Sequence, residues 1–181
     1  MAQTQTVLLI GTRKGLWIGR SDDRETWTIE GPQLPMEEVA AVGVDPRGGP
    51  IQADASQAAG PEPDGEVATP RLFAGSTNFV YGTRVLRSDD LGHSWQSVPE
   101  DAIRFPERTG TKLNRVWQIT PGVLPGEVWA GVEPSAVFRS TDGGVTFTMN
   151  DALWDHPHRE TWTPAPAYRA SRRGAARIAA P

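Results

Sequence analysis

The chain contains no cysteine, which excludes disulfide bonds within it, thiolate catalysis and cysteine-based metal sites. Lysine is almost absent, with only Lys14 and Lys112, and the net charge is −4. A general nucleic-acid surface needs clustered basic residues, so we expect no nucleic-acid partner. The apolar run 7–10 is too short for a signal peptide or a membrane span. We therefore expect a cytoplasmic protein with no membrane partner.

Glycine and proline are abundant, with 19 and 16 residues in a chain of 181. Both break helices and favour turns, so this composition argues against a helical bundle. Hydrophobic residues make up 38% of the chain, which is enough to build a core. The composition favours one turn-rich domain of ordinary size.

The main signal is an internal repeat. Each copy has a short apolar strand ending in glycine, a loop, a second apolar strand, an Arg-Ser pair, an acidic turn and an aromatic residue. The copies occupy residues 8–27, 71–95 and 127–147. A further apolar strand precedes the second copy (38–44) and the third (114–120), which predicts four short strands per unit. An inserted flexible loop, residues 48–70, explains the longer first interval.

The acidic turn of each copy has a structural explanation. Asp side chains accept hydrogen bonds from nearby backbone N–H groups, and glycine supplies a positive φ. An aromatic residue then opens the outer strand and buries its ring between blades. The residues assigned to this role are Ser21, Asp22 and Trp27 in the first copy, Ser88, Asp89 or Asp90, Gly92 and Trp95 in the second, and Ser140, Asp142, Gly144 and Phe147 in the third.

These turns resemble the BNR or Asp-box repeat, Ser-x-Asp-x-Gly-x-Thr-Trp. Segment 139–147 fits best, 87–95 fits well and 20–27 fits in part. The resemblance covers about residues 6–150 and implies an all-β fold, a β-propeller of BNR/Asp-box type. Segments 11–17 and 129–134 are similar to an uncharacterised bacterial group often labelled glycosyl hydrolase or sialidase.

The length of the chain leaves room for only about three to four blades, so we expect an incomplete propeller over residues 1–163. Residues 164–181 are almost all Pro, Ala, Arg, Ser and Gly, which predicts a disordered or out-of-frame tail on a truncated reading frame. The alternative is a natural short form that completes its ring by self-association through open blade edges.

The residues expected to contact a ligand are basic, acidic or aromatic and fall on loops or inner strands. The Arg13-Lys14 pair suits an anionic ligand, and an aromatic residue on an inner strand suits a sugar. Two histidines with a neighbouring aspartate suit a metal, but Pro157 between them disfavours the strand that would align them. We therefore predict no metal and no cofactor. The candidates are Arg13, Lys14, Trp117, Glu133, Trp154, Asp155, His156, His158 and Trp162.

Sialidase sites, in the resembled family, use three arginines, a Tyr–Glu pair and an acid/base Asp. The early Arg-Ile-Pro motif is absent here, and the only tyrosines are Tyr81 and Tyr168. A glycosidase also needs two facing carboxylates, and no spacing fixes the separation of the candidate acids, Glu37, Glu38, Glu133 and Asp155.

The leading hypothesis is a propeller module that binds a carbohydrate or protein ligand without catalysis. The alternative is a sialidase-like or endoglucanase-like glycoside hydrolase whose active site is incomplete in this chain. A third interpretation is a misfolding-prone fragment without activity.

Overall fold

The computed structural model describes residues 5–48, 69–99 and 102–162. Residues 49–68 of the predicted insertion and the predicted 164–181 tail lie outside the described residues, and so does Tyr168. Within the described part, antiparallel strands dominate and the helices are single turns.

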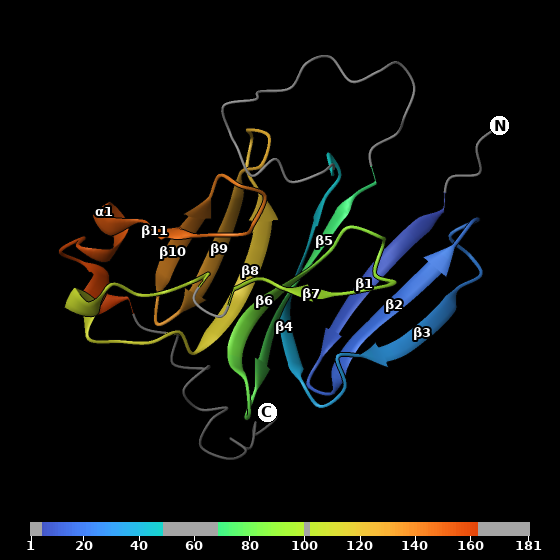
Figure 1. Ribbon diagram of the computed structural model, residues 1–181, viewed down its shortest axis with the longest axis horizontal. Coiled ribbons are helices and arrows are strands. Elements are labelled where there is room, and N and C mark those ends of the chain that lie inside the picture. Colours follow the sequence, from blue (N-terminus) through green and yellow to red (C-terminus); the bar gives the residue numbers. More distant parts are fainter. Residues whose placement is uncertain (1–4, 49–68, 100–101, 163–181) are drawn as a thin grey trace, which may run out of the picture.

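Three antiparallel sheets follow one another in chain order across the molecule (Figure 1). Blade 1 consists of β1 (Thr6–Thr12), β2 (Gly15–Ser21) and β3 (Thr28–Gln33). Blade 2 consists of β4 (Glu38–Asp45), β5 (Arg71–Asn78), β6 (Gly82–Ser88) and β7 (Gln96–Ser97). Blade 3 consists of β8 (Arg115–Pro121), β9 (Val128–Glu133), β10 (Ala136–Ser140) and β11 (Thr148–Met149). The short helices are η1 (Glu107–Thr109), α1 (Asp151–Trp154) and η2 (Arg159–Thr161).

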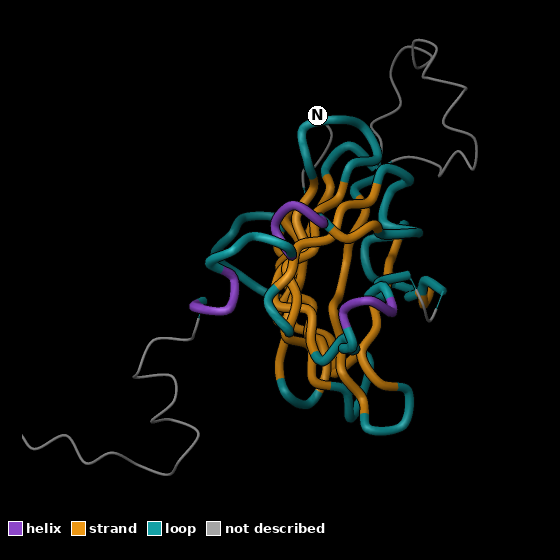
Figure 2. Tube along the Cα trace, turned by 90° about the vertical axis from the view of Figure 1, so that its left-hand side faces the viewer, coloured by secondary structure: helices purple, strands orange, loops and turns teal. Residues whose placement is uncertain are grey.

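Within each sheet, every strand pairs with the next strand of the chain, so the sheets are simple meanders. The first strands of blades 2 and 3, β4 and β8, lie side by side, and Gly43 leaves room for the backbone of Ile119. The second view shows the strands running in one general direction with loops at both ends (Figure 2). The chain is therefore all-β and forms three successive blades of a β-propeller.

The hydrophobic core lies between the blades. One cluster joins blades 2 and 3 and includes Phe73, Val116 and Phe138, which are almost fully buried. A smaller cluster joins blades 1 and 2 and includes Leu16 and Ile18. Blade 2 lies between these two clusters, so its sheet packs against a neighbouring blade on each face.

Blade 1 differs from the others in strand number. The acidic turns connect β2 to β3, β6 to β7 and β10 to β11. By this alignment β1 corresponds to β5 and β9, and the counterpart of β4 and β8 is missing from the first sheet among the described residues. The predicted four strands per unit are therefore confirmed for blades 2 and 3, whereas blade 1 has three.

Candidate functional site

The two ends of the sheets have different chemistry. The register pairs Glu38 with Thr77 at one end of blade 2 and Asp45 with Arg71 at the other. The β5–β6 hairpin tip therefore lies where β4 begins, and the acidic turn after β6 lies where β4 ends. Blade 3 is arranged in the same way. We call these the hairpin-tip end and the Ser–Asp turn end.

At the Ser–Asp turn end, each turn is closed by the same hydrogen bonds. The Ser21, Ser88 and Ser140 hydroxyls donate to an aspartate two residues on, at 3.0, 2.7 and 2.6 Å. In blades 2 and 3 the serine hydroxyl also accepts the N–H of Gly92 or Gly144. The aromatic residue follows and the outer strand begins immediately after it.

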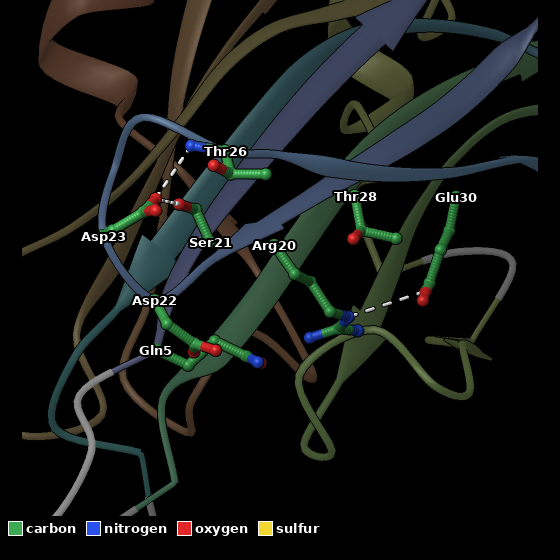
Figure 3. Close-up of a pocket in the computed structure, with 8 residues that line it drawn as sticks. All are labelled: Gln5, Arg20, Ser21, Asp22, Asp23, Thr26, Thr28 and Glu30. Carbon is green, nitrogen blue, oxygen red and sulfur yellow. Dashed lines mark hydrogen bonds and ion pairs between the residues drawn. The ribbon is translucent and has the colours of Figure 1, made fainter.

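The hydrogen bonds show which acid closes each turn: they correct the assignment in blade 1 and select one of the two acids predicted in blade 2. In blade 1 it is Asp23, which accepts the backbone N–H groups of Glu25 and Thr26, and not Asp22 (Figure 3). In blade 2 it is Asp90, whereas Asp89 forms ion pairs with Arg71 and Arg87. The Ser-x-Asp spacing of blade 3 identifies the acid two positions after serine, and the doubled aspartates of the other turns obscured this. Asp22 lines a polar pocket of ≈ 380 Å³ beside Asp23.

Hydrogen bonds to these carboxylates lower their pKa values. The Ser94 hydroxyl and N–H lower the pKa of Asp90 to about 2, and the Thr26 and Glu25 N–H groups lower the pKa of Asp23 to about 2. For Asp142, burial acts to raise the pKa, but the bonds from Ser140 and Thr146 lower it overall. The carboxylates are engaged as charged turn acceptors, which is a structural role.

The turns also join neighbouring blades. Arg20 of blade 1 donates to the carbonyl of Leu91 at 2.8 Å, and Arg71 of blade 2 lies 3.5 Å from the carbonyl of Gly143. Leu91 and Gly143 occupy equivalent turn positions, both with positive φ. The next residue in each turn is a glycine that packs on the preceding blade.

The predicted aromatic positions differ in burial. Phe147 is buried in the cluster between blades 2 and 3. Trp95 is partly buried against the smaller cluster, and its indole N–H donates to Gln33 of blade 1 at 2.6 Å. Trp27 is also partly buried, and its N–H donates to the carbonyl of Arg24 within its own turn.

The hairpin-tip end of blade 2 holds a buried polar cluster. Glu37, just before β4, accepts the Ser76 hydroxyl at 2.5 Å and an Arg84 N–H at 2.6 Å. Glu37 and Ser76 are buried, and Arg84 is mostly buried. The guanidinium of Arg84 also lies 5.1 Å from the ring centre of Tyr81.

This cluster has no counterpart in the other blades. Ser76 pairs with Arg84 across β5 and β6. The equivalent pairs are Ile10 with Trp17 in blade 1 and Val132 with Ala136 in blade 3. The fold therefore does not require polar residues here, which marks the cluster as a special feature of blade 2.

A second ion pair joins the blades at the same end. Arg115 at the start of β8 donates to Glu38 of β4 at 3.0 Å, and its guanidinium lies 4.7 Å from the ring centre of Trp117. Trp117 occupies a register shift of β8, where the strand carries an extra residue, and Ala40 occupies the same position in β4. A bulge of this kind redirects a side chain, and the Trp117 ring is exposed.

The β5–β6 tip carries three consecutive exposed apolar residues, Phe79, Val80 and Tyr81, which we call the apolar tip. Phe79 is 86% exposed. The side chain of Asn78 accepts the N–H groups of Val80 and Tyr81, so the tip is held as a turn. The corresponding tips are Arg13-Lys14 in blade 1 and Pro134-Ser135 in blade 3.

The predicted ligand contacts are only partly brought together. Arg13 and Lys14 are exposed at the blade 1 tip, and Glu133 ends β9 at the blade 3 tip. Together with Trp117 they share the hairpin-tip end. Sequence reasoning weighed Glu37 and Glu38 as acids but missed their partners, because Glu37, Ser76 and Arg84 are far apart in the chain.

The other candidates lie in the segment after β11. Trp154 packs against Phe105 and under the guanidinium of Arg159, and Asp155 pairs with Arg108 at 2.9 Å. His156 stacks on Trp162 and meets the ring of His158 edge-on. The two histidines lie in a turn between α1 and η2 and do not share a strand face.

Two further properties concern the described residues only. They contain no group of three or more His, Cys, Asp or Glu side chains placed to hold a metal ion. Within the same ranges, none of the helices has the length and hydrophobicity needed to span a bilayer.

Comparison with protein families finds no match, and none is found among curated proteins. Among solved structures, that of YCF48 bound to D1 peptide is similar to this chain, with a TM-score of 0.44 and 14% identity. The similarity covers 82% of this chain, and the chain spans 40% of that structure. The fold assignment rests on the three sheets described above.

Proposed function

We propose that the chain is an Asp-box-type β-propeller module that binds a protein partner through the hairpin-tip end of blade 2. The Ser-x-Asp turns, with their repeated serine and glycine hydrogen bonds, support the Asp-box type. The single observation that carries the binding function is the apolar tip. Aromatic residues are enriched at the centres of protein interfaces, and an ordered tip loses little entropy on binding.

The surroundings of the apolar tip also suit a protein partner. Met36, just before β4, and Trp117 are further exposed apolar side chains at this end. The guanidinium groups of Arg84 and Arg115 lie over the rings of Tyr81 and Trp117, respectively. Each arginine is also held by an ion pair, Arg84 with Glu37 and Arg115 with Glu38. An apolar centre bordered by anchored charges is the usual arrangement of an interface core and rim.

The experiment is selection from a displayed random-peptide library against the purified chain. We expect recovered peptides to bind the wild type and to lose at least about tenfold in affinity for Phe79→Ser/Tyr81→Ser, since two central contacts are removed. Val123→Ser/Leu124→Ser is the matched control, because it removes two exposed apolar residues from the Ser–Asp turn end. Peptides that bind all three proteins equally would overturn the proposal.

A glycoside hydrolase is the second candidate, because two acidic residues, Glu37 and Glu38, are consecutive in the chain at this end. Each is bonded to an arginine, whereas a glycosidase needs one carboxyl free to donate a proton. Hydrolysis of aryl glycosides by the wild type, abolished by Glu38→Gln, would favour the enzyme over the binding module.

A further inference from the structure

Two exposed aromatic rings at the hairpin-tip end each carry an arginine. The guanidinium of Arg84 lies 5.1 Å from the ring centre of Tyr81, and that of Arg115 lies 4.7 Å from the ring centre of Trp117. Each ring therefore has a positive charge beside the surface that a partner would contact. A second cation brought to either ring is repelled by the arginine already there, whereas a carboxylate is attracted to it.

The acidic residues of this end are already engaged. Glu37 is buried and pairs with Arg84 at 2.6 Å, and Glu38 pairs with Arg115 at 3.0 Å. Glu133, at the end of β9, has an interaction partner as well. A partner with lysine or arginine side chains would therefore have to break an existing contact in order to pair with one of these three carboxylates.

Three further cations of this end are not neutralised in this way. The side chains of Arg13, Lys14 and Lys112 are exposed, and none of them forms an ion pair within residues 5–48, 69–99 and 102–162. The chain has only two lysines, and both belong to this group although the net charge of the chain is −4. The hairpin-tip end is therefore a locally basic surface on an acidic protein.

Contacts between the blades bring these cations toward the apolar tip. Gly11, just before the blade 1 tip, packs against the carbonyl of Val39 near the start of β4. Asn114, two residues after Lys112, accepts the Thr83 hydroxyl of β6 through its carbonyl at 2.6 Å. In Figure 1 the β1–β2 tip, the β5–β6 tip and the start of β8 all lie along the lower edge of the molecule. The apolar tip belongs to the middle blade, so it has cations on the sides of blades 1 and 3.

We propose that the hairpin-tip end binds an acidic peptide segment, in which apolar side chains contact Phe79 and Tyr81 and flanking Asp or Glu side chains face Arg13, Lys14 and Lys112. This inference rests on the proposed function, because it names the chemistry of the same partner. Complementary charge increases the rate of association and sets specificity more than it raises affinity. The same cations exclude basic segments, which selects among partners that offer similar apolar side chains.

A displayed random-peptide library, selected against the purified chain at low ionic strength, provides the first test. We expect the recovered peptides to carry apolar residues together with more Asp and Glu, and fewer Lys and Arg, than the unselected library. Peptides that need Phe79 and Tyr81 but show no acidic excess would overturn the acidic partner and leave the protein-binding function standing. Peptides indifferent to those two side chains, or the recovery of none, would overturn both.

Two single substitutions on blade 1 separate the charge of this end from the charge of the whole chain. Lys14→Glu and Arg24→Glu change the net charge equally and alter exposed side chains at opposite ends of the sheet. At about 10 mM salt we expect Lys14→Glu to weaken binding of a recovered peptide about fivefold and Arg24→Glu less than about twofold. Thermal unfolding establishes that both variants are folded.

Salt provides a further check on the same pair of variants. The loss caused by Lys14→Glu should largely disappear at about 1 M salt, because the charges are exposed and are then screened. Equal losses for the two variants, or a loss that salt leaves unchanged, would contradict an acidic partner.

Vesicles of phosphatidylserine and phosphatidylcholine test the other anionic surface that apolar and basic side chains suit. We expect the wild-type chain to remain unbound when the vesicles are sedimented. Sedimentation with the vesicles that is abolished by Phe79→Ser/Tyr81→Ser would assign this end to a lipid surface and overturn the peptide as its occupant.

Discussion

The two ends of the blades differ in how far they repeat. At the Ser–Asp turn end, blades 2 and 3 use the same serine, aspartate and glycine contacts, and blade 1 keeps the first two. At the hairpin-tip end, the three tips share no residue type, and only blade 2 has the Glu37 cluster and the apolar tip. A contact that is repeated in the blades stabilises the blade itself, whereas a feature that only one blade has is available to bind a partner.

The largest loss of stability is expected for Gly144→Ala, because Gly144 lies at the junction between blades 2 and 3. A Cβ there would lie 2.6 Å from Cε1 of Phe73, which is fully buried, and φ is +86°. Overpacking and a strained backbone together should cost about 3 kcal/mol of unfolding free energy in urea. The control is Gly82→Ala, with φ +72° and open space around it, which should cost about 1 kcal/mol. Equal losses would show that the turn does not lock the blades.

The next largest loss of stability is expected in the buried polar cluster at the hairpin-tip end. Arg84→Ala leaves the buried Glu37 carboxylate with one fewer partner and should lower the unfolding free energy by about 2 kcal/mol. The triple variant Glu37→Asn/Ser76→Val/Arg84→Ala installs the residues that blade 3 has at these positions. It should recover all but about 1 kcal/mol, since no charge is then left buried. A triple variant less stable than the single one would make the cluster a structural requirement of blade 2.

A smaller loss of stability is expected when the carboxylate of a Ser–Asp turn is removed. Asp90→Ala should cost about 1 kcal/mol at pH 7, as the loss of a capping carboxylate does elsewhere. The folded pKa of Asp90, about 2, is below the unfolded value near 3.9. Its stabilisation is therefore complete above about pH 4 and is lost as the pH falls toward 2. Urea unfolding of both proteins at several pH values tests this, and a difference that persists undiminished at pH 2 would contradict it.

The repeated end is also the part that the sequence predicts well. Short apolar strands with a Ser–Asp turn give the blade order and the start of each outer strand, because these signals are local. Only Asp23 was missed, since two adjacent aspartates look alike until the hydrogen bonds are drawn. The absence of a fourth strand from the first sheet, among the described residues, is recognised only when its Ser–Asp turn is aligned with the Ser–Asp turns of the other two sheets.

The hairpin-tip end was harder to predict because its contacts are not local. Trp117 was expected at the site, but its partner Arg115 acts together with Glu38, 77 positions earlier in the chain. The apolar tip carried a local signal, three large apolar residues followed by glycine, but the exposure of their side chains is a property of the folded chain.

The smallest effect on stability is expected where the effect on binding is largest. Phe79→Ser/Tyr81→Ser removes side chains that are mostly in water, so the unfolding free energy should change by no more than about 0.5 kcal/mol. The fold of the tip is held by Asn78 and survives the change. Urea unfolding beside the wild type provides the measurement. A loss above about 2 kcal/mol would mean that the rings support blade 2, and the contrast between a structural end and a binding end would then fail.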